Sequence, residues 1–199
     1  MRIAISGAVS TGKTTLGKAL AEKFNLPFIG ENLAPLFGKN AARRKNTKDV
    51  ANAVVACLKN KRILETKTGN FIVDRSPLDL MNFWQSAQLP KMCGGHDFTV
   101  LCESYMTLYD FVVLTPFEGV PFVQDASGAD KPRRVMDPWV QFKGSVRITG
   151  LAHHFLEPSK IIQIPAAMSA HEERLAFVLD NLHSRNDDNK EQPIFGDFH

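Results

Sequence analysis

Residues 7–14 constrain the fold of this chain more than any other segment. They read Gly-Ala-Val-Ser-Thr-Gly-Lys-Thr and match the pattern G-x-x-x-x-G-K-[ST] at every fixed position. A short apolar run at residues 2–6 precedes them, and a stretch with helical spacing of apolar residues follows at 14–23. A strand, a glycine-rich turn and a helix N-terminus in this order direct backbone N–H groups to one point, where a polyphosphate binds. The sequence therefore predicts a nucleoside triphosphate site rather than a chance glycine-rich turn.

The chemistry of this loop assigns a role to its last residues. Lys13 is expected to reach the β- and γ-phosphates, and the Thr14 hydroxyl to bind Mg²⁺. ATP and Mg²⁺ are therefore the expected cofactors. The predicted nucleotide-binding residues are the loop and the start of its helix: Gly7, Ala8, Val9, Ser10, Thr11, Gly12, Lys13, Thr14 and Thr15.

The rest of the chain alternates between strand and helix patterns. This alternation predicts an α/β domain with a mostly parallel sheet, whose ligands gather at the C-terminal ends of the strands. Further strands are predicted at 27–30, 71–73, 111–114 and 161–164, and helices at 48–66, 78–87, 98–109, 137–156 and 169–184, the last capped by Ser169. Residues 115–136 carry prolines, glycines and charges and are predicted to form a mobile lid loop.

Length and composition favour a single domain. The 199 residues carry a net charge of +3, and 23% of them are charged. We expect one domain over residues 1–184 and a polar tail over 185–199. Three cysteines without a C-x-x-C pair (Cys57, Cys93 and Cys102) indicate reduced thiols, and the sequence has no signal peptide or membrane-length apolar run. These features predict a cytoplasmic protein.

Two carboxylates follow predicted strands at the edge where such a sheet binds its ligands. Asp74 comes directly after the apolar residues 71–73, as expected for an acid that holds Mg²⁺ through a water molecule. Glu31 closes the predicted second strand. The alternatives are a helix N-cap for Asp74 and a solvated loop carboxylate for Glu31.

Phosphoryl transfer also needs cations over the transferred group. Arg133 and Arg134, at the end of the predicted lid, are suitably placed, although a solvated basic surface would carry the same residues. Arg147 lies within a predicted helix and is a weaker candidate. The adjacent His153 and His154 point to different faces of that helix, so no metal site is assigned to them.

Taken together, the phosphate loop, Glu31, Asp74-Arg75-Ser76 and the arginine-bearing loop after residues 111–114 resemble the small P-loop kinases of the thymidylate kinase, deoxynucleoside kinase and nicotinamide riboside kinase group. The resemblance implies a P-loop fold with a five-stranded parallel sheet of order 2-3-1-4-5 and a lid. It also implies that Glu31 is the base for the attacking hydroxyl, Arg75 a cation that orients phosphate or substrate, and Asp74 the metal-side acid.

The chain departs from this pattern in ways that bear on the acceptor. Asn32 stands where deoxynucleoside kinases usually have proline, and residues from Lys39 to Lys48 form a basic block. Phage kinases that resemble thymidylate kinases and phosphorylate 5-hydroxymethyluracil within DNA fit these features, since a positive surface would bind the flanking backbone. This acceptor is favoured, with a free nucleoside or nucleotide as the alternative. Taken alone, the basic block is equally typical of a solvated helix face.

Three other classes fit the sequence less well. A GTPase would need N-K-x-D, but residues 46–49 read Asn-Thr-Lys-Asp, and the D-x-x-G match at residues 125–128 follows the wrong strand. A nucleic-acid motor would need a second domain. A DNA-binding module would leave Lys13, Thr14, Glu31 and Asp74 without a role.

Overall fold

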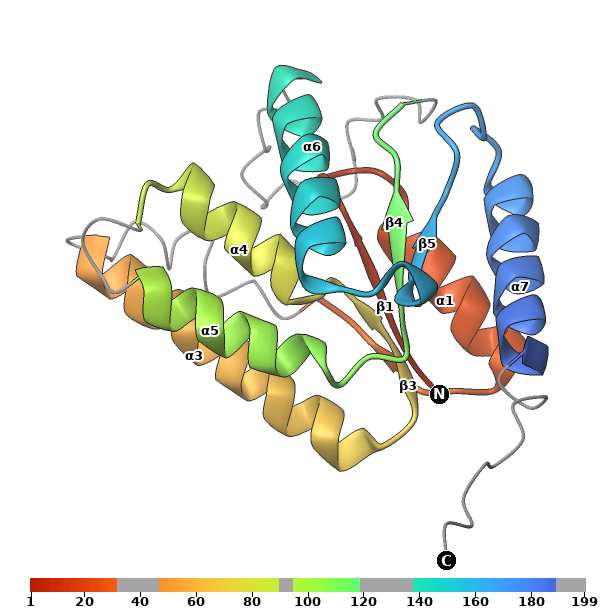
Figure 1. The fold of residues 1–199 in the computed structure, drawn as a ribbon, viewed down its shortest axis with the longest axis horizontal. Helices are drawn as coiled ribbons and strands as arrows, with labels where there is room; N and C mark the ends of the chain where they lie inside the picture. The colour runs from red at the N-terminus through yellow and green to blue at the C-terminus, as the bar shows by residue number, and fades with distance from the viewer. Residues whose placement is uncertain (32–46, 90–94, 119–137, 189–199) are drawn as a thin grey trace, which may run out of the picture.

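Five parallel strands form the centre of the computed structural model, which describes residues 1–31, 47–89, 95–118 and 138–188. The strand order is β2-β3-β1-β4-β5, which confirms the predicted P-loop fold and its sheet (Figure 1). Each crossover returns the chain to the same edge, so the strand ends that bear polar residues meet there. The strands are β1 (Arg2–Gly7), β2 (Phe28–Ile29), β3 (Phe71–Asp74), β4 (Phe111–Thr115) and β5 (Ile161–Gln163).

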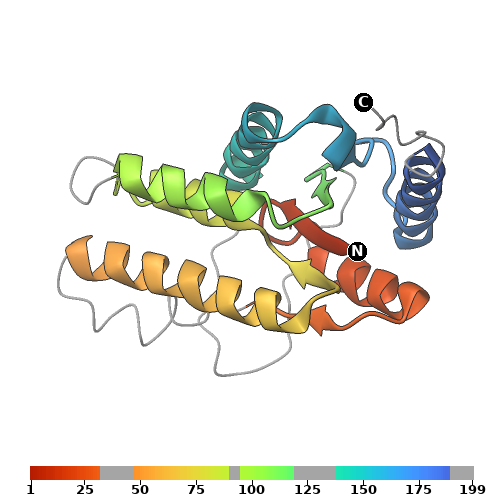
Figure 2. The same ribbon diagram turned by 60° about the horizontal axis from the view of Figure 1, so that its bottom comes forward.

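Helices cover both faces of the sheet. On one face lie α1 (Lys13–Phe24) and α7 (His171–Asp188), and on the other α4 (Pro77–Ser86) and α6 (Pro138–Phe155) (Figures 1 and 2). Two more helices, α3 (Thr47–Thr68) and α5 (Gly95–Met106), pack against α4 rather than against the centre of the sheet. A short 3-10 turn at Pro158–Lys160 leads into β5.

The apolar core divides into two layers because successive strand residues face opposite sides of the sheet. On β1, Ile3 and Ile5 pack with Leu16 and Leu20 of α1, while Ala4 packs with Ile148 of α6. A third apolar cluster joins α3, α4 and α5. All of β1, β3 and β4 is buried apart from Arg2, as expected for parallel strands covered on both faces.

Several predicted helix boundaries were wrong by a few residues. The helix predicted at 98–109 is α5 and begins at Gly95, where Asp97 in its first turn favours the N-terminus. The final helix begins at His171, so Ser169 does not cap it directly, and the first-turn acids Glu172 and Glu173 follow this later start. It also continues to Asp188, past residue 184.

Two of the three cysteines lie in the described residues. Cys57 and Cys102 are free and buried, and no group of three potential metal-binding side chains occurs in these ranges. In the same ranges, no helix has the length and apolar character needed to cross a membrane. The residues predicted to form the lid and the basic block lie mostly outside the described ranges, at 119–137 and 32–46.

Candidate active site

The phosphate loop connects β1 to α1 at the C-terminal edge of the sheet, and two glycines allow its path. A Cβ atom on Gly7 would lie 2.1 Å from Oγ1 and 2.8 Å from the carbonyl oxygen of Thr115, so only glycine fits against β4 here. Gly12 adopts the left-handed conformation, with φ of 82°, and is the N-cap of α1. These glycines bring the backbone close to β4 and turn it into the helix.

The inner side of the loop is fixed by hydroxyl groups. Thr11 Oγ1 and Thr115 Oγ1 share a hydrogen bond of 2.7 Å, which ties the loop to the end of β4. Thr11 Oγ1 also lies 3.0 Å from the carbonyl oxygen of Ala8, and Thr115 donates to the carbonyl of Ser6 at 3.2 Å. Thr11 and Thr115 are both buried, so these bonds are shielded from competing water.

Two side chains from later helices donate to backbone carbonyls of the loop. Gln141 of α6 donates from Nε2 to the carbonyl oxygen of Val9 at 2.8 Å. Arg174 of α7 donates to the carbonyl oxygen of Thr11 at 3.1 Å. The loop is therefore bound to elements from both faces of the sheet.

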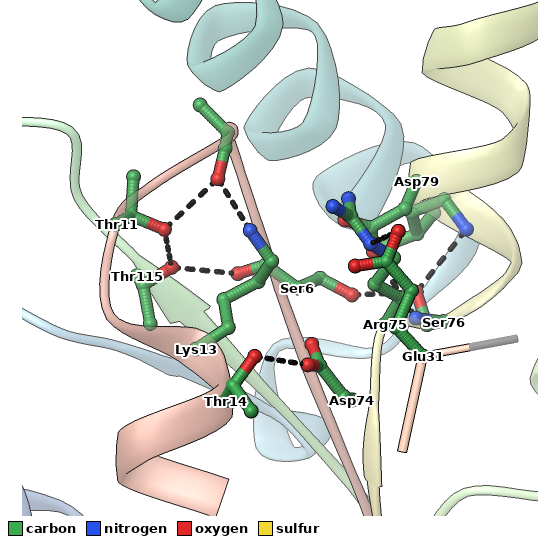
Figure 3. Close-up of polar contacts among 12 residues, drawn as sticks. Ser6, Thr11, Lys13, Thr14, Glu31, Asp74, Arg75, Ser76, Asp79 and Thr115 are labelled. Atoms are coloured by element: carbon green, nitrogen blue, oxygen red, sulfur yellow. Dashed lines mark hydrogen bonds and ion pairs between the residues drawn. The ribbon is translucent and has the colours of Figure 1, made fainter. Parts of the chain in front are cut away.

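Lys13 points back into the loop and donates to the carbonyl oxygen of Ala8 (Figure 3). Its side chain is buried, and this burial, together with the positive charge of Arg75, lowers the pKa of Lys13 to about 8, although the carboxylates of Asp79, Asp74 and Glu31 act in the opposite direction. Within the described ranges, its hydrogen-bond partner is a neutral carbonyl, so this buried cation is suited to bind a phosphate, whose negative charge would stabilise it.

Thr14 and Asp74 meet between the loop and β3. The Thr14 hydroxyl donates to Oδ2 of Asp74 (Figure 3). The other carboxylate oxygen, Oδ1, is buried and has no hydrogen-bond partner among the described residues. An oxygen atom of this kind is the ligand that Mg²⁺ prefers, alone or through water. The two side chains therefore fit a magnesium site.

A second charged group lies beside these residues, at the ends of β2 and β3. The guanidinium of Arg75 contacts Glu31 at 3.3 Å and Asp79 at 3.2 Å. Burial lowers the pKa of Arg75, but the carboxylates of Asp79, Glu31 and Asp74 outweigh it and raise this pKa above its ordinary value. Arg75 thus stays charged in a site that is shielded from water.

The backbone around Arg75 is strained and is held by its neighbours. Arg75 has a φ of 73°, a conformation that is costly for a residue with a side chain. Its N–H donates to the carbonyl of Ile5 at 2.8 Å, and Ser76 next to it caps α4 in a capping box with Asp79. The Ser6 hydroxyl donates to that of Ser76 at 2.6 Å, so β1 also supports this turn.

The structure therefore places several predicted residues in one region. Lys13, Thr14, Asp74, Arg75 and Glu31 come together at the C-terminal edge of the sheet (Figure 3), with Asp74 the last residue of β3. Thr15 is exposed on α1. Arg147 lies farther along α6 and donates to the Ser86 hydroxyl of α4 at 2.8 Å. Arg133, Arg134 and the basic residues up to Asn46 lie outside the described residues.

Four contributing residues were not predicted from the sequence. Asp79 had a local signal, since Ser76-x-x-Asp79 is a capping-box pattern. Thr115, Gln141 and Arg174 had none, because each acts on a loop more than a hundred residues earlier in the chain.

Sequence comparison assigns the chain to a family. A family model described as an AAA domain matches residues 2–147, which include the phosphate loop, Asp74 and Arg75. The chain belongs to this family. No curated protein matches its sequence.

Solved structures with the same fold are distant in sequence. Deoxyadenosine kinase from M. mycoides superposes with a TM-score of 0.66 at 15% identity, over 92% of this chain and 99% of the other. Thymidylate kinase from Candida albicans gives a TM-score of 0.61 at 11% identity, over 93% of this chain and 92% of the other. NadR protein in complex with NR gives 0.65 at 14% identity over 93% of this chain, which spans only 51% of NadR. The chain therefore shares its fold with P-loop kinases.

Proposed function

We propose that the protein is an ATP-dependent kinase that transfers the γ-phosphate to a hydroxyl group of a nucleoside- or nucleotide-type acceptor. The observation that carries this proposal is the pairing of two half-sites at one sheet edge. One consists of Lys13, Thr14 and Asp74 on the phosphate loop and β3, and the other of Glu31, Arg75 and Asp79. An ATPase without an acceptor has no evident use for the second group.

Each of these residues would have a separate role in phosphoryl transfer. Lys13 would neutralise charge on the transferred phosphoryl group, which is the main requirement of this reaction. Glu31 would accept the proton of the attacking hydroxyl, after exchanging its contact with Arg75 for the acceptor. Arg75 would then be free to orient the acceptor or its phosphate. Mg²⁺ held by Thr14 and Asp74 would supply further charge neutralisation.

The relatives of known structure support the acceptor class by analogy. They are deoxyadenosine kinase with dCMP and dCDP bound, thymidylate kinase, and NadR in complex with NR. Because this chain shares only the fold with them, their acceptors define a panel to test. The basic block from Lys39 to Lys48 adds 5-hydroxymethyluracil in DNA, which we favour within that panel.

A single experiment tests the proposal. The protein is incubated with Mg-ATP and, separately, deoxynucleosides, deoxynucleoside monophosphates, nicotinamide riboside and 5-hydroxymethyluracil DNA. We expect one class to gain phosphate in a one-to-one ratio with ADP, and the Lys13→Ala variant to transfer none while its circular dichroism stays unchanged. Release of free phosphate at the same rate with and without every acceptor would instead establish an ATPase.

A further inference from the structure

Arg174 lies outside both half-sites, yet its guanidinium contacts the backbone of the phosphate loop. The residue belongs to the first turn of α7, and only 4% of its surface is exposed. Within the described part of the chain it forms no ion pair with a carboxylate. A buried guanidinium is costly unless its N–H groups are used, so the acceptors that it contacts are informative.

Among the described residues, Arg174 donates to three backbone carbonyl oxygens, which belong to different segments. Nε donates to Met168 at 2.7 Å, one terminal nitrogen to Thr11 at 3.1 Å, and the other to Glu118 at 3.1 Å. These residues belong to the connection between β5 and α7, the phosphate loop, and the segment that leaves β4. One side chain therefore joins three segments at the edge of the sheet where the phosphate loop lies.

The contact with Thr11 fixes the direction of the next amide group. In a trans peptide the C=O and the following N–H point to opposite sides, and the chain has no cis peptide bond in the described residues. Since Arg174 holds the Thr11 carbonyl, the N–H of Gly12 points away from Arg174. Loops of this kind bind phosphate through successive backbone N–H groups, so the direction of the Gly12 N–H matters for the nucleotide site.

Gly12 itself does little to maintain that orientation. It has a φ of 82°, and a Cβ atom placed on it would find no neighbour within 4 Å. The Gly12 carbonyl accepts from the N–H of Leu16 at 3.0 Å, but this bond restrains the peptide that follows Gly12, not the one that precedes it. The Thr11 side chain is anchored to Thr115, but that bond does not involve the peptide between Thr11 and Gly12.

We propose that Arg174 is a positioning residue for the nucleotide: it holds the peptide between Thr11 and Gly12 so that the Gly12 N–H is aimed at the phosphates. In this role Arg174 acts through the loop backbone, to which it donates at Thr11. This role rests on the proposed nucleotide site, and it adds to Lys13 and Thr14 a residue from the far end of the chain.

The test compares Mg-ATP and inorganic tripolyphosphate binding by calorimetry in wild type, Arg174→Met and Arg174→Lys, without an acceptor. Arg174→Met should weaken both ligands about ten- to a hundredfold, the range for one hydrogen bond to a charged group. Arg174→Lys should recover only a small part of the affinity lost in Arg174→Met, because one ammonium group cannot bind three carbonyls from different segments at once. The unchanged charge of the Lys variant separates geometry from electrostatic attraction.

Arg185 provides a matched control on the same helix. Its terminal nitrogen also donates to backbone carbonyls, those of Pro158 and Ser159, which lie far along the sequence from the phosphate loop. Arg185→Met should leave the affinity for both ligands within about twofold of wild type. If it weakened them as much as Arg174→Met, the effect would be one of general stability, and the proposed role would be wrong.

Other outcomes separate this role from the proposed function. Three results would each overturn the role of Arg174 and leave the kinase proposal intact. In the first, Arg174→Met binds both ligands normally, and in the second, Arg174→Lys recovers the full wild-type affinity. In the third, Arg174→Met loses affinity for ATP but not for tripolyphosphate. Failure of the wild-type protein to bind Mg-ATP would overturn both. If Arg174→Met does not fold, the comparison of Arg174→Lys with wild type decides the question.

Discussion

The ammonium group of Lys13 is buried near the guanidinium of Arg75, and these two conditions lower its pKa to about 8. In the empty protein, the folded state therefore binds fewer protons than the unfolded state between pH 8 and 10.5, and the contribution of Lys13 to stability rises with pH across that window. A bound triphosphate has the opposite effect, because its negative charge raises the pKa of Lys13.

This linkage makes nucleotide affinity depend on pH. We expect the dissociation constant of Mg-ATP to be level just below pH 8 and to rise about tenfold per pH unit above it, since binding must then return a proton to Lys13. Calorimetry between about pH 7 and 9.5 measures the change. The Lys13→Arg variant, whose guanidinium stays charged throughout, should give a level curve. A level curve for the wild type would contradict the phosphate role of Lys13.

The carboxylates Glu31 and Asp74 can be separated by their kinetic effects. Glu31→Gln removes the proposed base and should lower kcat by about a hundredfold or more, with little change in the affinity for Mg-ATP. The comparison needs single-turnover rates and ATP binding measured on the same variant. An intact kcat would remove Glu31 from the role of base.

Asp74 should respond differently, because its Oδ1 has no hydrogen-bond partner among the described residues and is the atom that would bind the proposed metal. Asp74→Asn keeps an oxygen for the Thr14 hydroxyl but loses the negative charge that binds Mg²⁺. We expect the Mg²⁺ concentration for half-maximal activity to rise several-fold, while saturating Mg²⁺ restores much of the rate. Complete inactivity of Asp74→Asn at saturating Mg²⁺, together with a normal Glu31→Gln, would reverse the two assignments.

At the scale of the elements, β1 and β4 must approach closely for the phosphate loop to form. The tight contact of Gly7 with Thr115 leaves no room for a Cβ atom. Gly7→Ala should lower the free energy of unfolding by about 1–3 kcal/mol, the cost of overpacking, and should weaken Mg-ATP binding as the loop shifts. Urea unfolding measures the first effect and calorimetry the second.

Gly150 of α6 is the control for this substitution. A Cβ atom added to it would have no neighbour within 4 Å, and its φ is not positive. Gly150→Ala should therefore raise the stability by about 0.5–1 kcal/mol through its higher helix propensity, with unchanged nucleotide binding. Equal effects of the two substitutions would show that the contact between Gly7 and Thr115 does not matter.

The elements that local patterns define could be predicted, and those set by distant contacts could not. The loop at residues 7–14 and the apolar strand at residues 71–73 carry their signals within a few neighbouring residues. The short strand β2 and the start of α7 were placed less accurately, because a two-residue strand and the end of a helix have little local signal.

The same distinction applies to the site. Glu31, Asp74 and Arg75 could be selected because strand ends meet at one edge of a parallel sheet. Arg174 could not, since it lies 163 residues after Thr11, and Gln141 lies 132 residues after Val9. Their roles depend on how α6 and α7 pack, which no spacing within the sequence reveals.

At the scale of the whole molecule, a net charge of +3 is unevenly distributed along the chain. The basic block begins eight residues after Glu31 and ends at Lys48, in the first turn of α3. It therefore follows the half-site that we assign to the acceptor. If the acceptor is a base within DNA, cations here would bind the phosphates on either side of that base.

Salt dependence tests this acceptor. Contacts with duplex phosphates release counterions. The logarithm of the binding constant therefore falls linearly with the logarithm of the salt concentration, with a slope of about −0.9 per phosphate contact. We expect phosphorylation of 5-hydroxymethyluracil DNA to decline steeply with salt, and Arg43→Gln with Arg44→Gln to flatten the slope by about two units. The free nucleoside has no backbone, so its phosphorylation should respond little to salt or to these substitutions.

A second double variant controls for net charge. Lys18 and Lys23 are exposed on α1, which covers the sheet face opposite α4 and α6, so Lys18→Gln with Lys23→Gln removes the same charge elsewhere. It should leave the slope for DNA nearly unchanged. If both double variants flatten the slope equally, the attraction is a property of the total charge.

Efficient, salt-insensitive phosphorylation of the free nucleoside, with none of the DNA, would reject the DNA acceptor. The kinase proposal would then stand with a small-molecule acceptor.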